Sequence, residues 1–311
     1  MSTNRKPKNL LEAIQHFADV DVATDFVANL RWPEGPVCPR CGSHEYSYLT
    51  TRRVWKCKGC KKQYSVKLGT IFEDSPLGLD KWLPAIWLIA NTKNGISSHE
   101  LGRSLGVTQK SAWFMLHRIR LAMQTGSIEK MSGEIEVDET YIGWLARNTH
   151  AVDRKRKVTG RGRMLNNNKT AVFGALTRDG EVRAAVVPNT QGTTLKPQIG
   201  DWVEQGATVY SDTHGGYYGL GRDYDHRTVD HVEQYVNGRV HTNGIENFWS
   251  LLKRGLHGTY VSVEPFHLFR YIDERVFTYN RRDLDDSGRF EWVLSAVTGR
   301  RLTWVEVTGT R

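Results

Sequence analysis

The four cysteines of the chain have the spacing of a metal-binding group. Cys38 and Cys41 form C-P-R-C, and Cys57 and Cys60 form C-K-G-C after fifteen intervening residues; the chain has no other cysteine. Two short knuckles, each supplying two thiolates, can close a tetrahedral site around one Zn²⁺. A redox pair or two disulfides would use the same residues, but paired knuckles favour zinc. We therefore predict a zinc ribbon over residues 36–66, with a strand hairpin between its knuckles.

A second group of residues could hold a divalent cation that prefers oxygen ligands. Asp138 and Asp212 each stand at the end of a strand-like run. Glu246 and Lys253 lie seven residues apart on a predicted helix, nearly two turns, so both side chains leave one face. Three converging carboxylates repel one another unless a cation neutralises them, and oxygen ligands suit Mg²⁺ or Mn²⁺. Each acid alone is more typical of a solvated or capping residue, so the prediction depends on the whole set.

The chemistry that such a site could perform is in-line attack on phosphorus. Two divalent ions can activate a water or a 3′-hydroxyl and stabilise the leaving oxygen. In that arrangement Lys253 would contact a phosphate or position the end of a nucleic acid.

Composition bounds the class of partner. The chain has 311 residues, a formal net charge of +9 and a sequence pI of about 9.4. This excess favours a polyanion such as nucleic acid, although a basic protein without that role would share it. Zinc thiolates favour the cytoplasm. The longest apolar run, residues 82–90, is far shorter than the ~18 residues of a membrane span, and the N-terminus has no apolar signal segment.

Helical patterns surround the predicted ribbon. Residues 1–35 should form two short helices, and residues 79–125 a helical region whose last two helices are joined by a turn at Gly106. Ser97 or Ser98 and Thr108 can cap these helices. The pattern predicts a helix-turn-helix, although an ordinary helical hairpin fits as well. On its second helix, the residues expected to remain available to DNA are Gln109, Lys110, His117 and Arg118.

The pattern from residue 132 to residue 282 is that of an α/β domain. Strands are expected at 134–138, 169–177, 181–188, 207–212 and 228–236, and helices at 194–203, 243–256 and 268–279. This order predicts a sheet with mixed strand directions. Residues 144–168 interrupt it with R-K-R-K-V-T-G-R-G-R, a solvated loop or a DNA-contacting arm that would use Lys155, Arg156 and Lys157. Residues 283–311 are expected to form a C-terminal tail.

Several strings resemble one family of enzymes. They include W-K-C-K-G-C-K-K-Q-Y-S-V-K-L-G-T-I-F, I-E-V-D-E-T-Y-I-G, V-Y-S-D and H-T-N-G-I-E-N-F-W-S-L-L-K-R-G-L-H-G-T-Y. With these strings the chain resembles the DDE transposases of bacterial insertion sequences that begin with a zinc ribbon, the ISXO-like group. The resemblance covers about residues 9–282. The chain departs from the family at Trp144, where relatives commonly carry glycine.

The resemblance implies an RNase H-like catalytic domain with Asp138 and Asp212 as the first two metal ligands. Some relatives have Asn in place of Glu in the third role, and here Asn243 and Asn247 flank Glu246. We prefer Glu246 because it is anionic and in phase with Lys253. It also implies a transposase that binds the inverted ends of its element as double-stranded DNA, as a homo-oligomer near the nucleoid, then cuts and joins DNA. A regulator without catalysis and a structure-selective nuclease of the same fold are the alternatives.

Four neighbouring residues are expected to be secondary. His241 and His214 fit polar loop positions, and Trp249 fits the core better than a base-stacking surface. Glu139 should point to the face opposite that of Asp138 if the strand continues.

Overall fold

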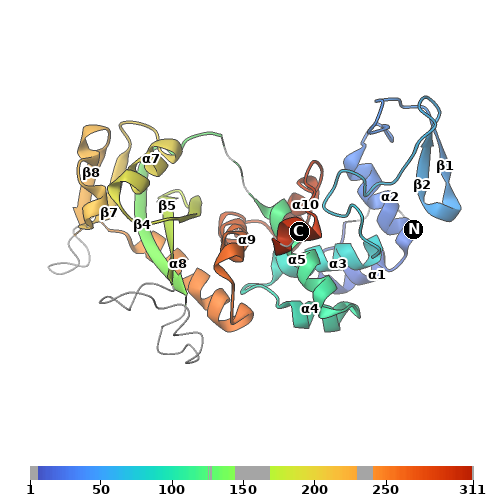
Figure 1. Ribbon diagram of the computed structural model, residues 1–311. Coiled ribbons are helices and arrows are strands. Elements are labelled where there is room, and N and C mark those ends of the chain that lie inside the picture. Colours follow the sequence, from blue (N-terminus) through green and yellow to red (C-terminus); the bar gives the residue numbers. More distant parts are fainter. Residues whose placement is uncertain (1–5, 125, 127, 144–168, 230–240, 310–311) are drawn as a thin grey trace. The chain divides into compact units, whose positions relative to one another are not determined.

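The computed structural model of the chain describes residues 6–124, 126, 128–143, 169–229 and 241–309 (Figure 1). The chain divides into two compact units: residues 1–124 together with 281–311, and residues 125–280. Both ends of the chain therefore belong to one unit. Within the described residues, no helix has the length and apolar character that crossing a lipid bilayer requires.

Two short helices open the first unit, as the sequence predicts. They are α1 at Leu10–Phe17 and α2 at Val20–Arg31. The Asp19 side chain accepts a hydrogen bond of 2.8 Å from the backbone N–H of Asp21. Because this cap satisfies an N–H that the first turn of a helix leaves unpaired, α2 begins immediately after α1 ends.

The predicted ribbon hairpin is extended by a third strand. The antiparallel strands, in the order β1-β2-β3, are β1 at Tyr46–Leu49, β2 at Val54–Cys57 and β3 at Gln63–Tyr64. The Trp55 ring centroid lies 5.0 Å from that of Tyr48 and 6.1 Å from that of Tyr64, so one face is aromatic. Lys56 is exposed and points from the other face, since side chains alternate along a strand.

Three longer helices follow, with the caps that the sequence predicts. They are α3 at Leu79–Asn91, α4 at Ser98–Leu105 and α5 at Gln109–Met123. Ser97 and Thr108 each accept a hydrogen bond of 3.2 Å from the backbone N–H three residues later. Gly106 ends α4 at a φ of 65°, a conformation that glycine adopts without steric cost.

The C-terminal segment is not the tail that the sequence suggested. It forms α10 at Asp286–Ser295 and α11 at Trp304–Thr308. Phe290 on α10 is fully buried, and its ring centroid lies 5.8 Å from that of Phe17 and 5.2 Å from that of Trp87. The segment folds because its apolar side chains complete the core of the first unit.

The second unit is built on one mixed sheet of five strands in the order β6-β5-β4-β7-β8 (Figure 1). The strands are β4 at Glu134–Gly143, β5 at Lys169–Thr177, β6 at Val182–Val187, β7 at Thr208–Asp212 and β8 at Asp225–Val229. The pairs β4–β5 and β5–β6 are antiparallel, whereas β4–β7 and β7–β8 are parallel. The predicted α/β class with mixed strand directions is therefore confirmed.

Helices cover both faces of this sheet. They are α7 at Gly192–Trp202, α8 at Asn243–Gly255 and α9 at Leu268–Asn280. Val137 and Phe173 belong to an apolar cluster with α7, whereas Val172 and Leu176 belong to a second cluster with α8 and α9. Shorter helical turns of the chain lie at Thr50–Arg52, Gly215–Tyr217, Leu220–Arg222, Leu256–Tyr260 and Pro265–His267.

Two strands differ from their predicted bounds by more than one residue. β4 does not end at Asp138 but continues to Gly143, because its pairing with β5 extends to Gly143 opposite Lys169. Asp138 therefore lies within a strand. The last strand begins at Asp225, before the predicted 228–236, and the part of that range from residue 230 onward lies outside the described residues.

Candidate metal and catalytic centres

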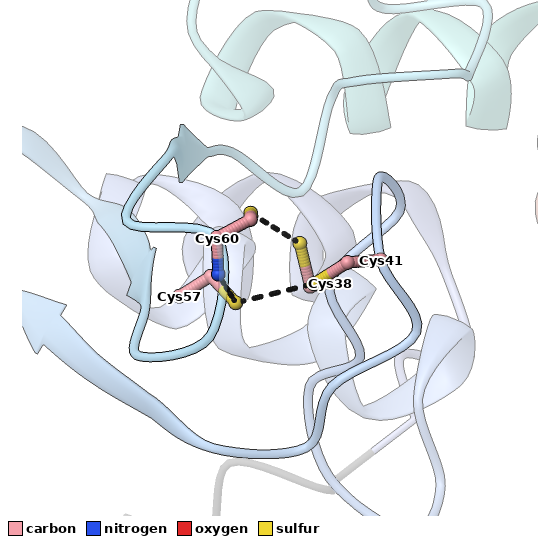
Figure 2. Close-up of side chains that lie close together, drawn as sticks. All are labelled: Cys38, Cys41, Cys57 and Cys60. Atoms are coloured by element: carbon pink, nitrogen blue, oxygen red, sulfur yellow. Dashed lines mark hydrogen bonds between the residues drawn. The ribbon is translucent and has the colours of Figure 1, made fainter.

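The four cysteines converge as predicted (Figure 2). Their sulfur atoms all lie within 4.8 Å of one another, and in the described part of the chain no other cluster of three or more His, Cys, Asp or Glu is this tight. The Sγ atoms of Cys38 and Cys60 are 3.7 Å apart, and those of Cys41 and Cys57 are 3.5 Å apart. A tetrahedral Zn²⁺ with Zn–S bonds of about 2.3 Å separates its sulfurs by about 3.8 Å, so the group fits zinc.

A backbone hydrogen bond in the second knuckle stabilises the thiolate form of Cys57. The N–H of Cys60 donates to the sulfur of Cys57 at 3.4 Å and, as the main cause, lowers the pKa of Cys57 to about 6. Metal binding requires the thiolate form, so this hydrogen bond favours a metal at the site.

The two predicted aspartates lie on neighbouring parallel strands. The parallel pairing of β4 and β7 extends to Glu136 opposite Tyr210, and Asp138 and Asp212 each follow two residues later, on the strand face that their paired predecessors share. Burial, together with the negative charges of Glu139 and Asp212, raises the pKa of Asp138 to about 7. A bound cation would relieve this repulsion between carboxylates, so the donor set fits a divalent ion with a preference for oxygen.

The third predicted carboxylate is on α8. Glu246 is exposed, and its Oε1 accepts a hydrogen bond of 3.0 Å from the hydroxyl of Thr242. Trp249, three residues later, donates its indole N–H to Asp138 at 2.9 Å and is buried, as expected. Because residues three apart are neighbours on a helix, this bond brings the Glu246 face of α8 to β4.

These acids do not form a closed metal cage. Among the described residues, Asp138, Asp212 and Glu246 do not meet as a group with oxygens within 4.8 Å of one another. Lys253 is half-buried on the same helix as Glu246. The arrangement is therefore an open set of carboxylates.

A polar network around Glu139 links β4 to the end of β7. Glu139 accepts a hydrogen bond of 2.5 Å from the hydroxyl of Tyr217 and lies 3.4 Å from Nδ1 of His214. The backbone N–H of His214 donates to Asp212 at 3.0 Å. Glu139 therefore points away from the Trp249 side, as predicted, and the network holds the loop after β7.

Sequence reasoning missed Glu136. This residue is 2% exposed and accepts a hydrogen bond of 3.0 Å from the backbone N–H of Ile245, in the first turn of α8. The alternation of Glu136 and Asp138 with apolar residues places both on one face of β4, but it does not show that Glu136 is buried.

The predicted DNA-contacting residues divide into three groups. Gln109 and Lys110 are exposed at the start of α5. The expectation that His117 and Arg118 remain available at the surface is wrong: they are 0% and 3% exposed. Arg118 donates to three backbone carbonyls, which explains how its charge is accommodated. Lys155, Arg156 and Lys157, like Trp144, lie outside the described residues.

Comparison with known proteins agrees with this architecture. The family model of the ISXO2-like transposase domain matches residues 130–280, and that of the transposase zinc-ribbon domain matches residues 19–63. The chain is 28% identical to an uncharacterized protein in transposable element ISH50 of Halobacterium salinarum, over 78% of this chain and 85% of that protein. It is 30% identical to an uncharacterized transposase-like protein of Haemophilus influenzae, over 33% of this chain and 85% of that protein. The chain therefore belongs to the ISXO2-like transposases, with an N-terminal transposase zinc ribbon.

Proposed function

We propose that the protein binds the inverted ends of an insertion sequence as double-stranded DNA and catalyses their metal-dependent cleavage and joining to target DNA. The observation that carries this proposal is the placement of Asp138 and Asp212 on adjacent parallel strands beside the helix that bears Glu246. The strand order also supports an RNase H-like catalytic fold. If the five strands are numbered by their order in the chain, their order across the sheet is 3-2-1-4-5, and the second of them, β5, is antiparallel to its neighbours.

In this proposal each residue of the site has a distinct role. Asp138 and Asp212 would hold Mg²⁺ or Mn²⁺, and Glu246 would complete the set from α8. When bound, these ions supply activation of the attacking oxygen and stabilisation of the leaving oxygen. Lys253 would contact a phosphate of the DNA end. The raised pKa of Asp138 supports the proposal, because crowded carboxylates at a strand junction are typical of a functional site.

Basic and polar surfaces of the first unit would bind the DNA ends. The second knuckle of the ribbon exposes Lys58, Lys61 and Lys62, and Lys56 is exposed on the adjacent strand. In a helix-turn-helix role, Gln109 and Lys110 at the start of α5 would read bases in the major groove. Lys155, Arg156 and Lys157 would add phosphate contacts, and assembly on two ends would involve more than one copy of the chain near the nucleoid.

The assignment of the third carboxylate is tested by a matched pair of variants. In a strand-transfer assay with the DNA that flanks the gene, Glu246→Gln should abolish joining, whereas Asn243→Ala should be milder. Lys253→Ala should reduce activity less than Glu246→Gln, because it would position phosphate and not hold metal. Near-normal joining by Glu246→Gln, with loss of joining in Asn243→Ala, would show that Glu246 is not the third ligand. Specific end binding without any cleavage would instead favour a regulator, and cleavage without joining a nuclease.

A further inference from the structure

A buried carboxylate joins the first turn of α8 to the central strand of the second unit. Glu136, at 2% exposure, lies on β4 two residues before Asp138, on the same strand face. Its Oε2 accepts a hydrogen bond of 3.0 Å from the backbone N–H of Ile245. The N-terminus of a helix carries partial positive charge and unpaired N–H groups, so a carboxylate there is favourable to helix placement.

The other oxygen of Glu136 faces positive or donor groups. Its Oε1 lies 3.7 Å from Nε of Arg178 and 3.2 Å from Nδ1 of His241. Arg178 in turn lies 3.7 Å from Glu134 and stacks over the Tyr210 ring at 4.3 Å. Oε2 of Glu136 is thus hydrogen-bonded and Oε1 lies within ion-pair distance of Arg178, which favours a structural role for Glu136 over that of a ligand for an ion.

The backbone of α8 approaches the sheet too closely for a side chain at its second residue. A Cβ placed on Gly244 would lie 2.6 Å from Leu176 and 2.8 Å from Oε2 of Glu136. One turn further on, a Cβ at Gly174 of β5 would lie 2.6 Å from the Trp249 ring. Both approaches favour glycine, because a Cβ at either position would displace the side chains between the helix and the sheet.

We propose that Glu136 is a positioning residue that fixes the first turns of α8 on β4 and so sets how well Glu246 reaches the cation held by Asp138. Two attachments define this placement: Glu136 to Ile245, and Asp138 to Trp249. Glu246 lies on α8 between the two attachment points. The inference rests on the proposed function, since it assigns a consequence for metal affinity.

The test is Mn²⁺ binding by the full-length, zinc-loaded chain, measured from the loss of the free Mn²⁺ signal in electron paramagnetic resonance. Glu136→Ala should weaken binding by about tenfold, the lower end of the effect seen when a group that orients a metal ligand is removed. Glu136→Gln retains an oxygen for the Ile245 N–H and should weaken binding by a smaller factor. This variant also decides the question if Glu136→Ala does not fold.

A second buried carboxylate supplies the control. Glu274 on α9 is also 2% exposed and accepts a hydrogen bond of 2.5 Å from Tyr260, beyond the other end of α8. Glu274→Gln should lower the melting temperature but leave Mn²⁺ affinity unchanged. Equal Mn²⁺ affinity in the wild type and both Glu136 variants would overturn the inference alone. A wild-type chain that binds no Mn²⁺ would overturn the proposed function and the inference together.

Discussion

At the scale of single residues, the candidate site brings together carboxylates whose negative charges repel one another. Asp138 is tied to Trp249, while burial and the charges of Glu139 and Asp212 raise its pKa to about 7. Such crowding destabilises a folded protein unless a ligand compensates, and active sites commonly retain it. The site should therefore be a source of instability in the absence of metal.

This instability should depend on pH. A carboxylic acid whose pKa is raised on folding binds more protons in the folded state between its two pKa values, so stability falls as pH rises. For Asp138 this window runs from 3.8, the ordinary value, to about 7. In metal-free buffer at pH 8, Asp138→Asn should therefore melt at a higher temperature than the wild type, and the difference should shrink at pH 5.

The control for this prediction is Asp179→Asn, in the exposed turn after β5 of the same unit. It should leave the melting temperature unchanged at both pH values. A melting temperature of Asp138→Asn at or below that of the wild type at pH 8 would contradict the account of a destabilising buried charge. Saturating Mg²⁺ should remove the advantage of Asp138→Asn, because the ion compensates the wild-type carboxylates.

At the scale of elements, sequence patterns predicted those features that depend on neighbouring residues. The caps at Ser97 and Thr108 and the turn at Gly106 were all correct, because they arise within a few residues of chain. The exposure of Arg118 was predicted wrongly. Its main-chain partners include the carbonyl of Leu302, 184 positions away, and helical periodicity contains no information about such a contact.

Arg118 should therefore act on stability and not on DNA recognition. Arg118→Met would leave the carbonyls of Leu302, Ile71 and Glu73 without this donor, and should lower the free energy of unfolding by about 3 kcal/mol. Urea denaturation would measure it. The matched variant is Gln109→Ala, exposed on the same helix, which should keep wild-type stability and change sequence preference for DNA. Unchanged stability in Arg118→Met would contradict the buried role.

Folding of the ribbon should depend on zinc, independently of the second unit. Its small sheet has three strands of two to four residues, and such a module gains much of its folding free energy from metal. Cys57→Ser should release the zinc, unfold residues of the ribbon and weaken DNA-end binding, while the melting of the second unit is preserved. Zinc content by atomic absorption and binding by gel shift would measure both effects. Full DNA binding without stoichiometric zinc would contradict this prediction.

At the scale of the whole molecule, the sequence predicted the order of ribbon, helices and mixed sheet but not how the chain ends are used. Residues 281–311 return to the first unit, where Phe290 contacts side chains contributed by the N-terminal helices. The prediction that Asp138 and Asp212 lie on neighbouring strands agrees with the parallel pairing of β4 and β7. Glu136 was not predicted, because a buried acid inside a strand has the same sequence signature as an exposed one.

The two units also divide the work of the proposed reaction. The first carries the zinc group and the residues proposed to read the DNA ends, Gln109 and Lys110, and the second carries the carboxylates together with the proposed phosphate contacts at Lys253 and residues 155–157. A change at the carboxylates should therefore separate chemistry from binding, which gives the proposal a direct test.

That test is a strand-transfer assay with Mg²⁺ or Mn²⁺ and the DNA that flanks the gene, run beside a gel-shift assay on the same DNA. Asp138→Asn and Asp212→Asn should each abolish cleavage and joining while end binding stays at the wild-type level, and Asp179→Asn should behave as the wild type. Ca²⁺ should support binding without turnover, because its coordination is longer and looser. Cleavage and joining that persist in both aspartate variants, or that proceed without a divalent ion, would contradict the account.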